Sequence, residues 1–443
     1  MKRWRGREGI TVVLGILLGG SLLQAEGYRQ IASRILHTPA VESARMLSRA
    51  AEESARAAEG ALLPSLDAEI RGVWLKETPE MILHTGLGPS QPLPMGKTRN
   101  FIGGLTLRYP LFTGFAVTAR IDQAKWRREA ARLKVLDLQR NLLLKAAELY
   151  SAVRGMQQVL AAQSAAQKAT LSALKKAQGM YRNGLIPPSA LYNIRARAYE
   201  MDAQIAQTRK RIAQMLNTLG YLSGKPVKSI SGPIALTKLP STRRLVREAY
   251  AHRADLRILQ SALQVDEAQI RLAESTLYPH IGVEAALKRQ GDTLALNGDG
   301  FTNADRSYLG VDLSWNLFNG GQDRHRIEAA RYQKLSRASA LIDYRQRVRN
   351  EIRNARLDLE ALYARLKSAK MQVKAQEEYY KLTRGRFENQ LASADELSRS
   401  IADLASARAR VASVHAQIEV QQAKLWLMSG VENFKKTLGI ARR

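Results

Sequence analysis

The sequence of 443 residues contains no cysteine, and this absence removes several classes of protein at once. Without a thiol, the chain can have no disulfide framework, no thiolate metal site, no cysteine nucleophile and no lipid anchor on an N-terminal cysteine. The six histidines are scattered, and no two of them have the spacing that metal ligands on one helix or hairpin need. We therefore expect no metal site, no cofactor and no enzymatic active site.

Long hydrophobic runs are also scarce. An apolar run near the N-terminus, residues 10–23, is shorter than the roughly 20 residues that a membrane-spanning helix needs. Basic residues precede this run and Ala25 follows it, which is typical of a secretory signal peptide. We predict a signal peptide at residues 1–25 with cleavage after Ala25. An uncleaved amphipathic anchor is the alternative.

Acidic residues are few in comparison with basic ones. The chain has 40 Asp and Glu against 69 Lys and Arg, which gives a net charge of +29. Such an excess is found in proteins that bind nucleic acid or anionic membrane surfaces. An exported protein does not normally meet genomic DNA, so we expect no nucleic-acid partner. We interpret the basic residues, such as those of segment 345–349, as a solvated outer face of helices; attraction of anionic cargo is the alternative.

The sequence contains two copies of one pattern. Residues 109–114, Tyr-Pro-Leu-Phe-Thr-Gly, resemble residues 315–320, Trp-Asn-Leu-Phe-Asn-Gly, and the two motifs lie 206 positions apart. The same offset relates residues 222–224 to residues 428–430. A constant offset over such a distance indicates an internal duplication, in which each copy is one supersecondary unit.

Within each copy, the order of elements follows from the sequence pattern. A first helix ends before a proline, since proline lacks a backbone donor and disfavours helix in the residue before it. Two segments of alternating apolar and polar residues follow, and then two long helical segments. The predicted organisation is a signal peptide (1–25), repeat one (26–224), a linker (225–241), repeat two (242–430) and a C-terminal tail (431–443). Repeat one contains a helix, a β-hairpin at 65–111 and a long helical hairpin at 116–221. Repeat two contains a helix at 243–276, a β-hairpin at 280–317 and a long helical hairpin at 322–429.

The predicted strands have the length and alternation of membrane β-strands. Apolar residues alternate with polar ones along 66–74 and 105–111, and again along 281–288 and 309–317. About 9–11 residues are needed for such a strand to cross a bilayer. We expect Trp74 and Trp315 in an interfacial aromatic belt, with a packed core as the alternative. Segments 85–97 and 291–305 are predicted as exposed loops.

The predicted helices are too long for an ordinary globular domain. Residues 116–181 contain no proline, and at about 1.5 Å per residue this segment spans roughly 100 Å. Within it, apolar residues step by four and three, as in a coiled-coil seam; they are Leu142, Ala146, Leu149, Val153, Met156 and Leu160. The chain should then reverse at Gly184 with a left-handed cap and restart at Pro188. Gln390 stands where Gly184 stands in the first copy, so we expect the second turn to close differently.

A membrane-spanning sheet must close on itself, because every backbone group in lipid needs a partner. Four strands cannot close, and known membrane barrels begin at about eight strands. The chain must therefore contribute its strands to a shared barrel. Two copies would give eight strands and a plugged interior, whereas three would give twelve strands and a lumen wide enough for solutes.

These features together resemble the TolC-like outer-membrane efflux proteins. The resemblance rests on the duplication, the proline before the first strand, the Phe-Thr-Gly and Phe-Asn-Gly motifs and the Tyr-Arg-Asn-Gly-Leu turn, and it covers about residues 35–430. It implies a mixed α/β membrane protein, a homotrimer with a shared twelve-stranded β-barrel continued by a long α-helical coiled-coil barrel. The missing cysteine makes it similar to the branch without a lipid anchor.

The resemblance also implies the function and the partners. Such a protein is a passive exit duct in the outer membrane, with its helices in the periplasm, and it belongs to a tripartite efflux or type I secretion system. It conducts small molecules or proteins and has no catalytic residues and no cofactor. Its partners would be outer-membrane lipid, a periplasmic adaptor protein and an inner-membrane pump of the RND, MFS or ABC class. The alternative is a periplasmic coiled-coil structural or adaptor protein without a membrane barrel; a basic nucleic-acid-binding coiled coil does not fit the signal peptide.

The resemblance assigns roles to individual residues. The periplasmic gate would be lined by Asp395, Glu396 and Arg399, although acids at a helix start also act as caps. Arg399 could pair with Asp395 or with Glu396. The hairpin tips that would contact the adaptor are Arg182, Asn183, Gly184, Leu185, Pro188, Asn389, Leu391 and Ser393. The junctions between strands and helices are Pro64, Phe112, Gly114, Pro279, Phe318 and Gly320. Where relatives have polar links that latch the gate, this chain has Ala190, Phe387 and Ala392, so we expect a weaker latch or one made by other residues.

Overall fold

A computed structural model describes residues 25–83, 91–298 and 304–440 of the chain. The predicted signal peptide lies outside these residues, apart from Ala25. The chain divides into two compact units. The sheet unit consists of residues 35–144, 236–361 and 421–443, and the hairpin unit consists of residues 1–34, 145–235 and 362–420.

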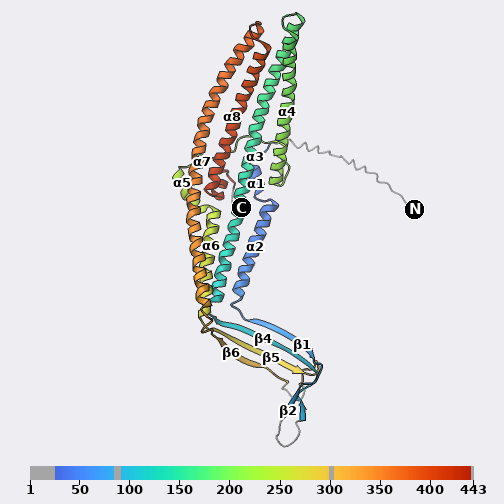
Figure 1. Cartoon of the computed structure of the whole chain (residues 1–443), viewed down its shortest axis with the longest axis vertical. Coiled ribbons are helices and arrows are strands. Elements are labelled where there is room, and N and C mark those ends of the chain that lie inside the picture. Colours follow the sequence, from blue (N-terminus) through green and yellow to red (C-terminus); the bar gives the residue numbers. More distant parts are fainter. Residues whose placement is uncertain (1–24, 84–90, 299–303, 441–443) are drawn as a thin grey trace, which may run out of the picture. The chain divides into compact units, whose positions relative to one another are not determined.

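The sheet unit contains one antiparallel sheet to which both repeats contribute (Figure 1). Its strands are β1 (Ser65–Trp74), β4 (Arg99–Thr113), β5 (His280–Gly291) and β6 (Tyr308–Ser314), in the order β1-β4-β5-β6. The two repeats join where β4 pairs with β5, and a bulge interrupts this pairing between Pro110 and Phe112. Strands β1 and β6 are therefore the two edges of the sheet.

Two details of the strands differ from the prediction. Strand β6 ends at Ser314, three residues before the predicted end at Leu317. The segment predicted as an exposed loop at 85–97 contains strand β3 (Gln91–Pro94), which pairs with β2 (Glu80–Leu83) in a separate two-stranded ribbon. Part of this loop, and part of the predicted loop 291–305, lies outside the described residues.

The pleat separates apolar from polar side chains on the four-stranded sheet. The apolar face is fully exposed in the single chain: Ile70 is 86% and Leu309 77% exposed. Its other large exposed members are Leu66, Leu105, Leu107, Leu287, Val311 and Leu313. An apolar surface of this extent is unfavourable in water and needs to be covered. For a sheet whose other face carries polar side chains, lipid is the expected cover.

Helices form the rest of the sheet unit. They are α2 (Pro39–Gly60), α5 (Thr242–His252), α6 (Ala254–Glu274), α9 (Val431–Thr437) and the first parts of α3 (Ala116–Arg182) and α7 (Gln322–Glu388). The prediction of one helix over residues 243–276 was wrong. The backbone is extended at Arg253, where ψ is 120°, so α5 and α6 are separate helices. A short 3-10 turn, Ser275–Leu277, follows α6. The predicted tail contains a packed helix, α9, in which Phe434 is fully buried.

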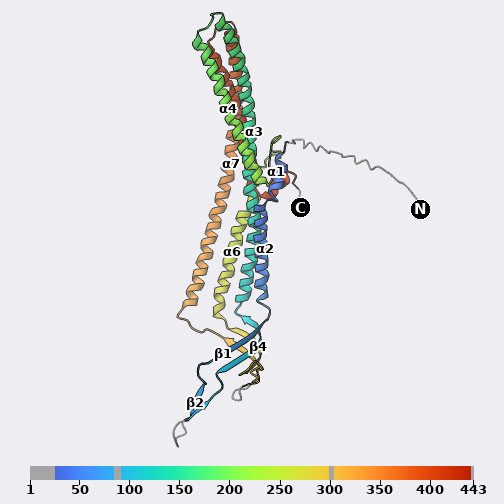
Figure 2. The ribbon, with the colours of Figure 1, turned by 90° about the vertical axis from the view of Figure 1, so that its right-hand side faces the viewer.

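The hairpin unit contains two long helical hairpins (Figures 1 and 2). The second part of α3 pairs with α4 (Pro188–Ser223), and the second part of α7 pairs with α8 (Ala394–Met428). Helix α1 (Tyr28–Ile35) begins in this unit, where Glu26 forms a parallel bridge with Ile230 of the linker. In the described part of the chain, no helix combines the length and the apolarity needed to cross a membrane.

The buried stripe of α3 differs in part from the predicted seam. Ala146 and Val153 are fully buried as expected, but Leu142, Leu149, Met156 and Leu160 are only half-buried. Tyr150 is buried in their place, next to Tyr28, and its hydroxyl donates to the carbonyl oxygens of Ser231 and Gly232. The irregular linker thus covers a face of α3 that the heptad pattern alone does not predict to be buried.

Candidate functional site: hairpin tips, strand junctions and a buried ion network

The first hairpin tip closes as its sequence predicts. Gly184 has a φ of +69°, and the amide of Leu185 donates to the carbonyl of Met180 at 2.9 Å. The amide of Gly184 donates to the carbonyl of Tyr181 at 3.0 Å, which completes a left-handed helix cap. Helix α4 then starts with Pro188 in its first turn. The cap and the restart are confirmed.

The second tip closes in the same way as the first, so the expected difference was wrong. Gln390 has a φ of +60°, and the amide of Leu391 donates to the carbonyl of Arg386 at 2.7 Å. The amide of Gln390 donates to the carbonyl of Phe387 at 3.1 Å. A side-chain amide of Asn389 also bonds to the carbonyl of Gly385. These bonds hold a glutamine in a conformation that costs a non-glycine residue about 1–2 kcal/mol.

The proposed gate residues lie at the start of α8 and are already paired within the chain. Ser393 caps the helix, since its hydroxyl accepts the amide of Glu396 at 3.1 Å. Asp395 pairs with Arg399 at 2.6 Å. Glu396 pairs instead with Arg386, at 2.9 Å, across the reversal of the chain. Sequence reasoning missed Arg386; a cation four residues before the left-handed position of a tight reversal is the signal that could have found it.

Arg386 connects the second turn to the acid in two ways. One guanidinium nitrogen donates to Glu396, and the other donates to the carbonyl of Leu391 at 3.1 Å. The carboxylate of Glu396 is 31% exposed, so solvent still reaches it. The same side chain therefore stabilises the turn and neutralises the acid next to it.

The positions predicted to hold the gate latch are apolar in this chain. Phe387 is 2% exposed and lies in a cluster to which α3, α4, α7 and α8 all contribute. Ala190 and Ala392 pack against this cluster. Its buried members, here called the tip cluster, are Ala166, Ala173, Ala177, Met180, Leu191, Ile194, Phe387, Ala394, Leu397 and Ile401. Both hairpins are joined near their tips by burial of apolar side chains.

One polar link also joins the two hairpins beside the tip cluster. The ammonium of Lys176 on α3 lies 3.3 Å from a carboxylate oxygen of Glu388 on α7. Arg384 also hydrogen-bonds to Glu388, and the two cations hold the pKa of the Glu388 carboxyl below its usual value. Both side chains of this pair are exposed to solvent, so its contribution to stability is small.

The ends of the tips are exposed. Leu185 in the first turn is 50% exposed, and Leu391 in the second is 68% exposed. Arg182, Asn183, Gly184, Pro188, Asn389 and Ser393 are exposed as well. Each tip thus presents one leucine among polar residues to its surroundings.

The junctions between strands and helices are built from glycines and aromatic rings. Gly114 has a φ of +57°, and a Cβ atom there would lie 2.5 Å from the carbonyl oxygen of Ser275, so only glycine fits. Phe115 packs edge-on between Phe112 and Tyr278, at 5.3 and 5.7 Å between ring centres. In the second repeat, Gly320 has a φ of +69°. Pro64 and Pro279 each directly precede a strand's first residue.

Exposed aromatic side chains lie at both ends of the apolar sheet face. At the end away from the junctions, Trp74 packs edge-on against Phe101 at 5.5 Å. At the junction end, the indole nitrogen of Trp315 donates to the carbonyl of Leu277, and Phe318 is 85% exposed. Such amphipathic rings favour the level of the lipid headgroups. Their placement supports the predicted belt rather than a packed core.

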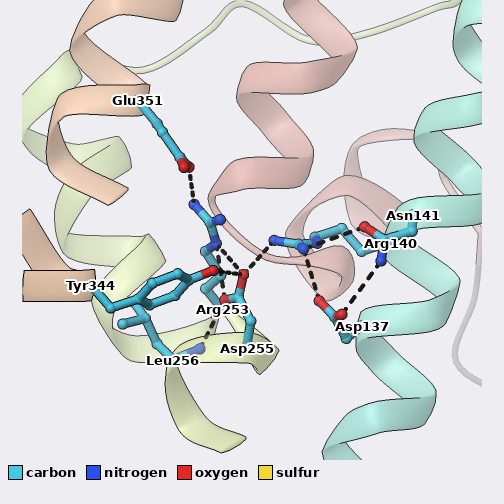
Figure 3. A network of polar contacts seen from close by, with 8 residues as sticks. All are labelled: Asp137, Arg140, Asn141, Arg253, Asp255, Leu256, Tyr344 and Glu351. Atoms are coloured by element: carbon cyan, nitrogen blue, oxygen red, sulfur yellow. Dashed lines mark hydrogen bonds and ion pairs between the residues drawn. The ribbon is translucent and has the colours of Figure 1, made fainter. Parts of the chain in front are cut away.

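A buried ion network holds the break between α5 and α6 (Figure 3). The Arg253 side chain is only 6% exposed and donates to Asp255 at 2.9 Å and to Glu351 on α7 at 3.1 Å. Asp255 also accepts from Arg140 on α3 and from the hydroxyl of Tyr344 on α7. Sequence reasoning missed this network, because its members lie far apart along the chain.

The network has a clear electrostatic consequence for Asp255. Burial alone would raise the pKa of its carboxyl, but the Arg253 and Arg140 guanidinium groups and the Tyr344 hydroxyl outweigh burial. The pKa of Asp255 is therefore below its usual value, and the carboxyl is ionised at neutral pH. In the described part of the chain, no three metal-binding side chains come together, so these carboxylates serve as partners of arginines.

Comparison with known proteins identifies the family of this chain. The model of the family called outer membrane efflux protein matches residues 31–225 and 245–431. The chain is similar to protein CyaE of Bordetella pertussis, with 26% identity over 355 residues, which are 78% of this chain and 73% of that protein. The two matched segments correspond to the two repeats.

Solved structures share the fold. VceC, an outer membrane protein of Vibrio cholerae, aligns with a TM-score of 0.76 at 17% identity, over 91% of this chain and 96% of that one. The CmeC outer membrane channel of Campylobacter jejuni aligns with a TM-score of 0.76 at 13% identity, over 95% and 91%. The predicted fold class is confirmed. The chain therefore belongs to the outer membrane efflux protein family: it is a TolC-like channel protein of the outer membrane with a periplasmic helical part, and it is a transport protein rather than an enzyme.

Proposed function

We propose that three copies of this chain form one continuous channel, and that the channel is the exit duct for cargo delivered by an inner-membrane pump of the RND, MFS or ABC class. A periplasmic adaptor protein connects the pump to the hairpin tips. The duct conducts small molecules or proteins passively, because the driving energy is spent by the pump.

The observation that carries this proposal is the open four-stranded sheet. Its apolar face is exposed, and its edges β1 and β6 have no partner strand among the described residues. A sheet in lipid cannot leave an edge unpaired, so the edges of several copies must pair with each other. Twelve strands from three copies give an open lumen, whereas eight from two copies give an interior filled by side chains.

The exposed tips support the adaptor contact. Leu185 and Leu391 are large apolar side chains that nothing in the single chain covers. Arg182 and Asn389 beside them offer polar groups for a second protein. Exposed apolar groups with a polar rim are the usual composition of a contact surface between proteins.

The residues at the start of α8 are the proposed periplasmic gate. Asp395, Glu396 and Arg399 of three copies would form a ring around the channel axis. Because Asp395 and Glu396 are each paired with an arginine, such a ring carries less net negative charge than the acids alone. We therefore infer a weakly cation-selective constriction, and the paired arginines moderate its affinity for divalent cations.

Two measurements test the proposal. The mature protein should fractionate with the outer membrane and resist carbonate extraction. Mass measurement of the detergent-extracted protein should then give three copies. Recovery as a soluble periplasmic protein, or as a stable monomer with a folded sheet, would contradict it.

A further inference from the structure

The first helical hairpin contains a long segment without a single acidic residue. Residues 149–199 include no Asp or Glu but seven Lys and Arg, whereas the equivalent residues of the second hairpin, 355–405, include nine cations and eight acids. The two hairpins are copies of one unit, so the duplication by itself does not explain this difference. The first hairpin is therefore strongly basic near its tip, and the second is nearly neutral.

Four of the seven cations in the acid-free segment are satisfied within the chain, three by a carboxylate and one by an aromatic ring; they are Arg154, Lys176, Arg197 and Arg195. The other three, Lys168, Lys175 and Arg182, are exposed. Among the residues that the structure describes, none hydrogen-bonds or ion-pairs with any of these three. The cations left without a partner thus all lie on α3.

The three unpaired cations share one face of α3. They are seven residues apart, and a helix returns to nearly the same side after two turns. Leu171 and Gln178 lie between them, at steps of three and four, and Leu171 is 49% exposed. These five residues, here called the basic stripe, extend over about 21 Å along the helix. The stripe ends three residues before Leu185, the exposed leucine of the first turn.

The basic stripe points away from the other helices at the tips. Ala173 and Ala177 face the tip cluster, and Lys175, two positions from each, is turned about 160° away from both. One flank of α3 contacts α4 through Gln167, and another contacts α7 through Lys176. A neighbouring copy would join the wall of the channel beyond these flanking helices, so its arrival leaves the stripe uncovered.

We propose that the basic stripe binds an acidic amphipathic helix of the periplasmic adaptor protein. The proposal rests on the adaptor contact proposed above, and it adds the chemistry of the partner and the place where it lies. The partner helix has carboxylates opposite the three cations and apolar side chains opposite Leu171 and Leu185.

The spacing of the stripe indicates a helix as the partner. Residues at steps of three and four form the seam of a coiled coil, in which a second helix places its side chains between those of the first. A helix of about four turns covers the distance from Lys168 to Arg182. Cations in seam positions weaken apolar packing, but they select a partner that has acids opposite them and reject one with cations.

The exposed leucines favour a protein over anionic cargo as the partner. A water-filled lumen that attracts soluble anions needs only charge, whereas Leu171 and Leu185 also expose apolar surface beside the cations. Exposed apolar groups with a polar rim are the usual composition of a contact between proteins. Because the segment around the stripe has no acid of its own, its charge is available to that partner.

Binding of a designed peptide tests the charge and the helix together. The probe is a synthetic helical peptide of about three heptads, with leucine and glutamate along one seam, added to the detergent-extracted trimer at physiological salt. We expect it to bind the wild type, and to bind about tenfold more weakly to the triple variant Lys168→Glu, Lys175→Glu, Arg182→Glu, since each exposed ion pair contributes roughly a factor of two to five. A peptide with lysine in place of glutamate should bind the triple variant instead.

A matched control separates the stripe from the overall charge. Arg209→Glu, Lys210→Glu and Arg211→Glu together change the net charge by the same amount, at exposed positions of α4. Salt screens charges that lie far from the bound peptide, so this variant should bind the acidic peptide nearly as well as the wild type does. Equal losses in both triple variants would show attraction by net charge alone and overturn the stripe as a specific contact.

Thiol labelling shows which side of the channel wall the stripe faces, and the chain has no native cysteine to interfere. Lys175→Cys in the assembled trimer should react with a maleimide attached to a polymer too wide to enter the channel. Reaction with a small maleimide only would place the stripe in the lumen, and would overturn the docking site in favour of anionic cargo.

The remaining outcomes separate this contact from the proposed duct. An assembled trimer that does not bind the acidic peptide, or that binds it equally well in the stripe variant, overturns the basic stripe as the docking site and leaves the duct intact. A chain that forms no trimer, or that is not recovered with the outer membrane, overturns the proposed duct itself.

Discussion

At the scale of single residues, the two hairpin tips use different amino acids for the same backbone conformation. Gly184 adopts its left-handed φ without steric cost, whereas Gln390 adopts it against the usual preference of a residue with a Cβ atom. The second turn keeps its shape because Arg386 and Asn389 add hydrogen bonds that the first turn lacks. The second tip is therefore the more strained of the two.

Gln390→Gly should relieve this strain. We expect the free energy of local opening at the second tip to rise by about 1 kcal/mol, because glycine loses no energy in the left-handed region. Hydrogen exchange of the peptide that contains the Leu391 amide should slow accordingly. Gly184→Gln is the matched reverse change and should speed exchange at the first tip by a similar factor; unchanged exchange in both variants would mean that neither turn is limited by backbone strain.

The gate acids should respond to their arginine partners. If Glu396 lines the channel, Glu396→Ala should reduce the block of single-channel current by divalent cations in planar bilayers. Arg386→Ala frees the carboxylate and should increase the block instead. Asp395→Ala is the control, because neighbouring positions on a helix point about 100° apart, and its effect should be smaller. Equal block in all variants would show that these acids only cap and brace the helix.

The buried network makes stability depend on pH in one direction. The folded pKa of Asp255 is lowered, so its contribution is complete above the carboxyl's unfolded pKa of about 4 and is lost as the pH falls through the folded value. Asp255→Asn should lower the free energy of unfolding at pH 7 by about 3 kcal/mol, since it leaves Arg253 buried without a charged partner. Thermal melts followed by circular dichroism should show a smaller further loss below pH 4 than in the wild type; parallel pH curves would exclude Asp255 as the titrating group.

At the scale of secondary-structure elements, packing decides what the sequence pattern leaves open. Helix α3 ends one residue after its predicted end at residue 181, and α7 begins at the predicted residue 322, since glycine, proline and turn residues mark those positions. The break at Arg253 and the buried face of Tyr150 were not predictable, because each depends on partners more than 80 residues away in the sequence. Local periodicity reports which residues are apolar, but not which neighbour will cover them.

The proposed gate residues show the same limit. Their place at the start of α8 could be predicted from the turn residues, whereas their role as a gate stays a prediction. Their pairing could not be predicted, because Arg386 and Glu396 are brought together only by the tight reversal at Gln390. The sequence indicated the apolar tip cluster only by the apolar residues Ala190, Phe387 and Ala392 at positions where polar residues were expected. In the structure, Phe387 is buried in this cluster, and Ala190 and Ala392 pack against it.

Phe387 should be the main support of the contact between the hairpins. Phe387→Ala removes a buried ring from the tip cluster and should cost about 3 kcal/mol or more of local stability. We expect faster hydrogen exchange in both hairpin tips and a higher resting conductance in planar bilayers. Leu382→Ala is the matched control on the same helix, since that side chain is 67% exposed. A wild-type conductance in Phe387→Ala would place the closing contacts elsewhere.

At the scale of the whole molecule, the single chain is an incomplete object. Its sheet has an apolar face with no cover and two edges with no strand beside them in the described residues. The sequence already indicates this, because four amphipathic strands cannot close a barrel. Completion therefore has to come from lipid on one face and from other copies at the edges.

The apolar face should tolerate no charge near its middle. Ile70→Lys puts an ammonium on the lipid side of β1 and should lower membrane stability by about 2–4 kcal/mol. Glu69→Lys, one residue earlier on the polar face, should insert normally. The fraction of heat-resistant oligomer in outer-membrane preparations measures the difference. Equal amounts for both variants would mean that the two faces do not differ in their contact with lipid.

The equal length of the two longest helices constrains how such a channel can evolve. Helices α3 and α7 have 67 residues each, and their return helices α4 and α8 have 36 and 35. Adding seven residues to one helix alone would move its tip by roughly 10 Å and leave the other tip behind. A duct of a different reach therefore requires matched insertions in both repeats and in both arms of each hairpin. The length of the duct can therefore change only by equal insertions or deletions in all four helices, whereas residues in its strands and turns can be substituted one at a time.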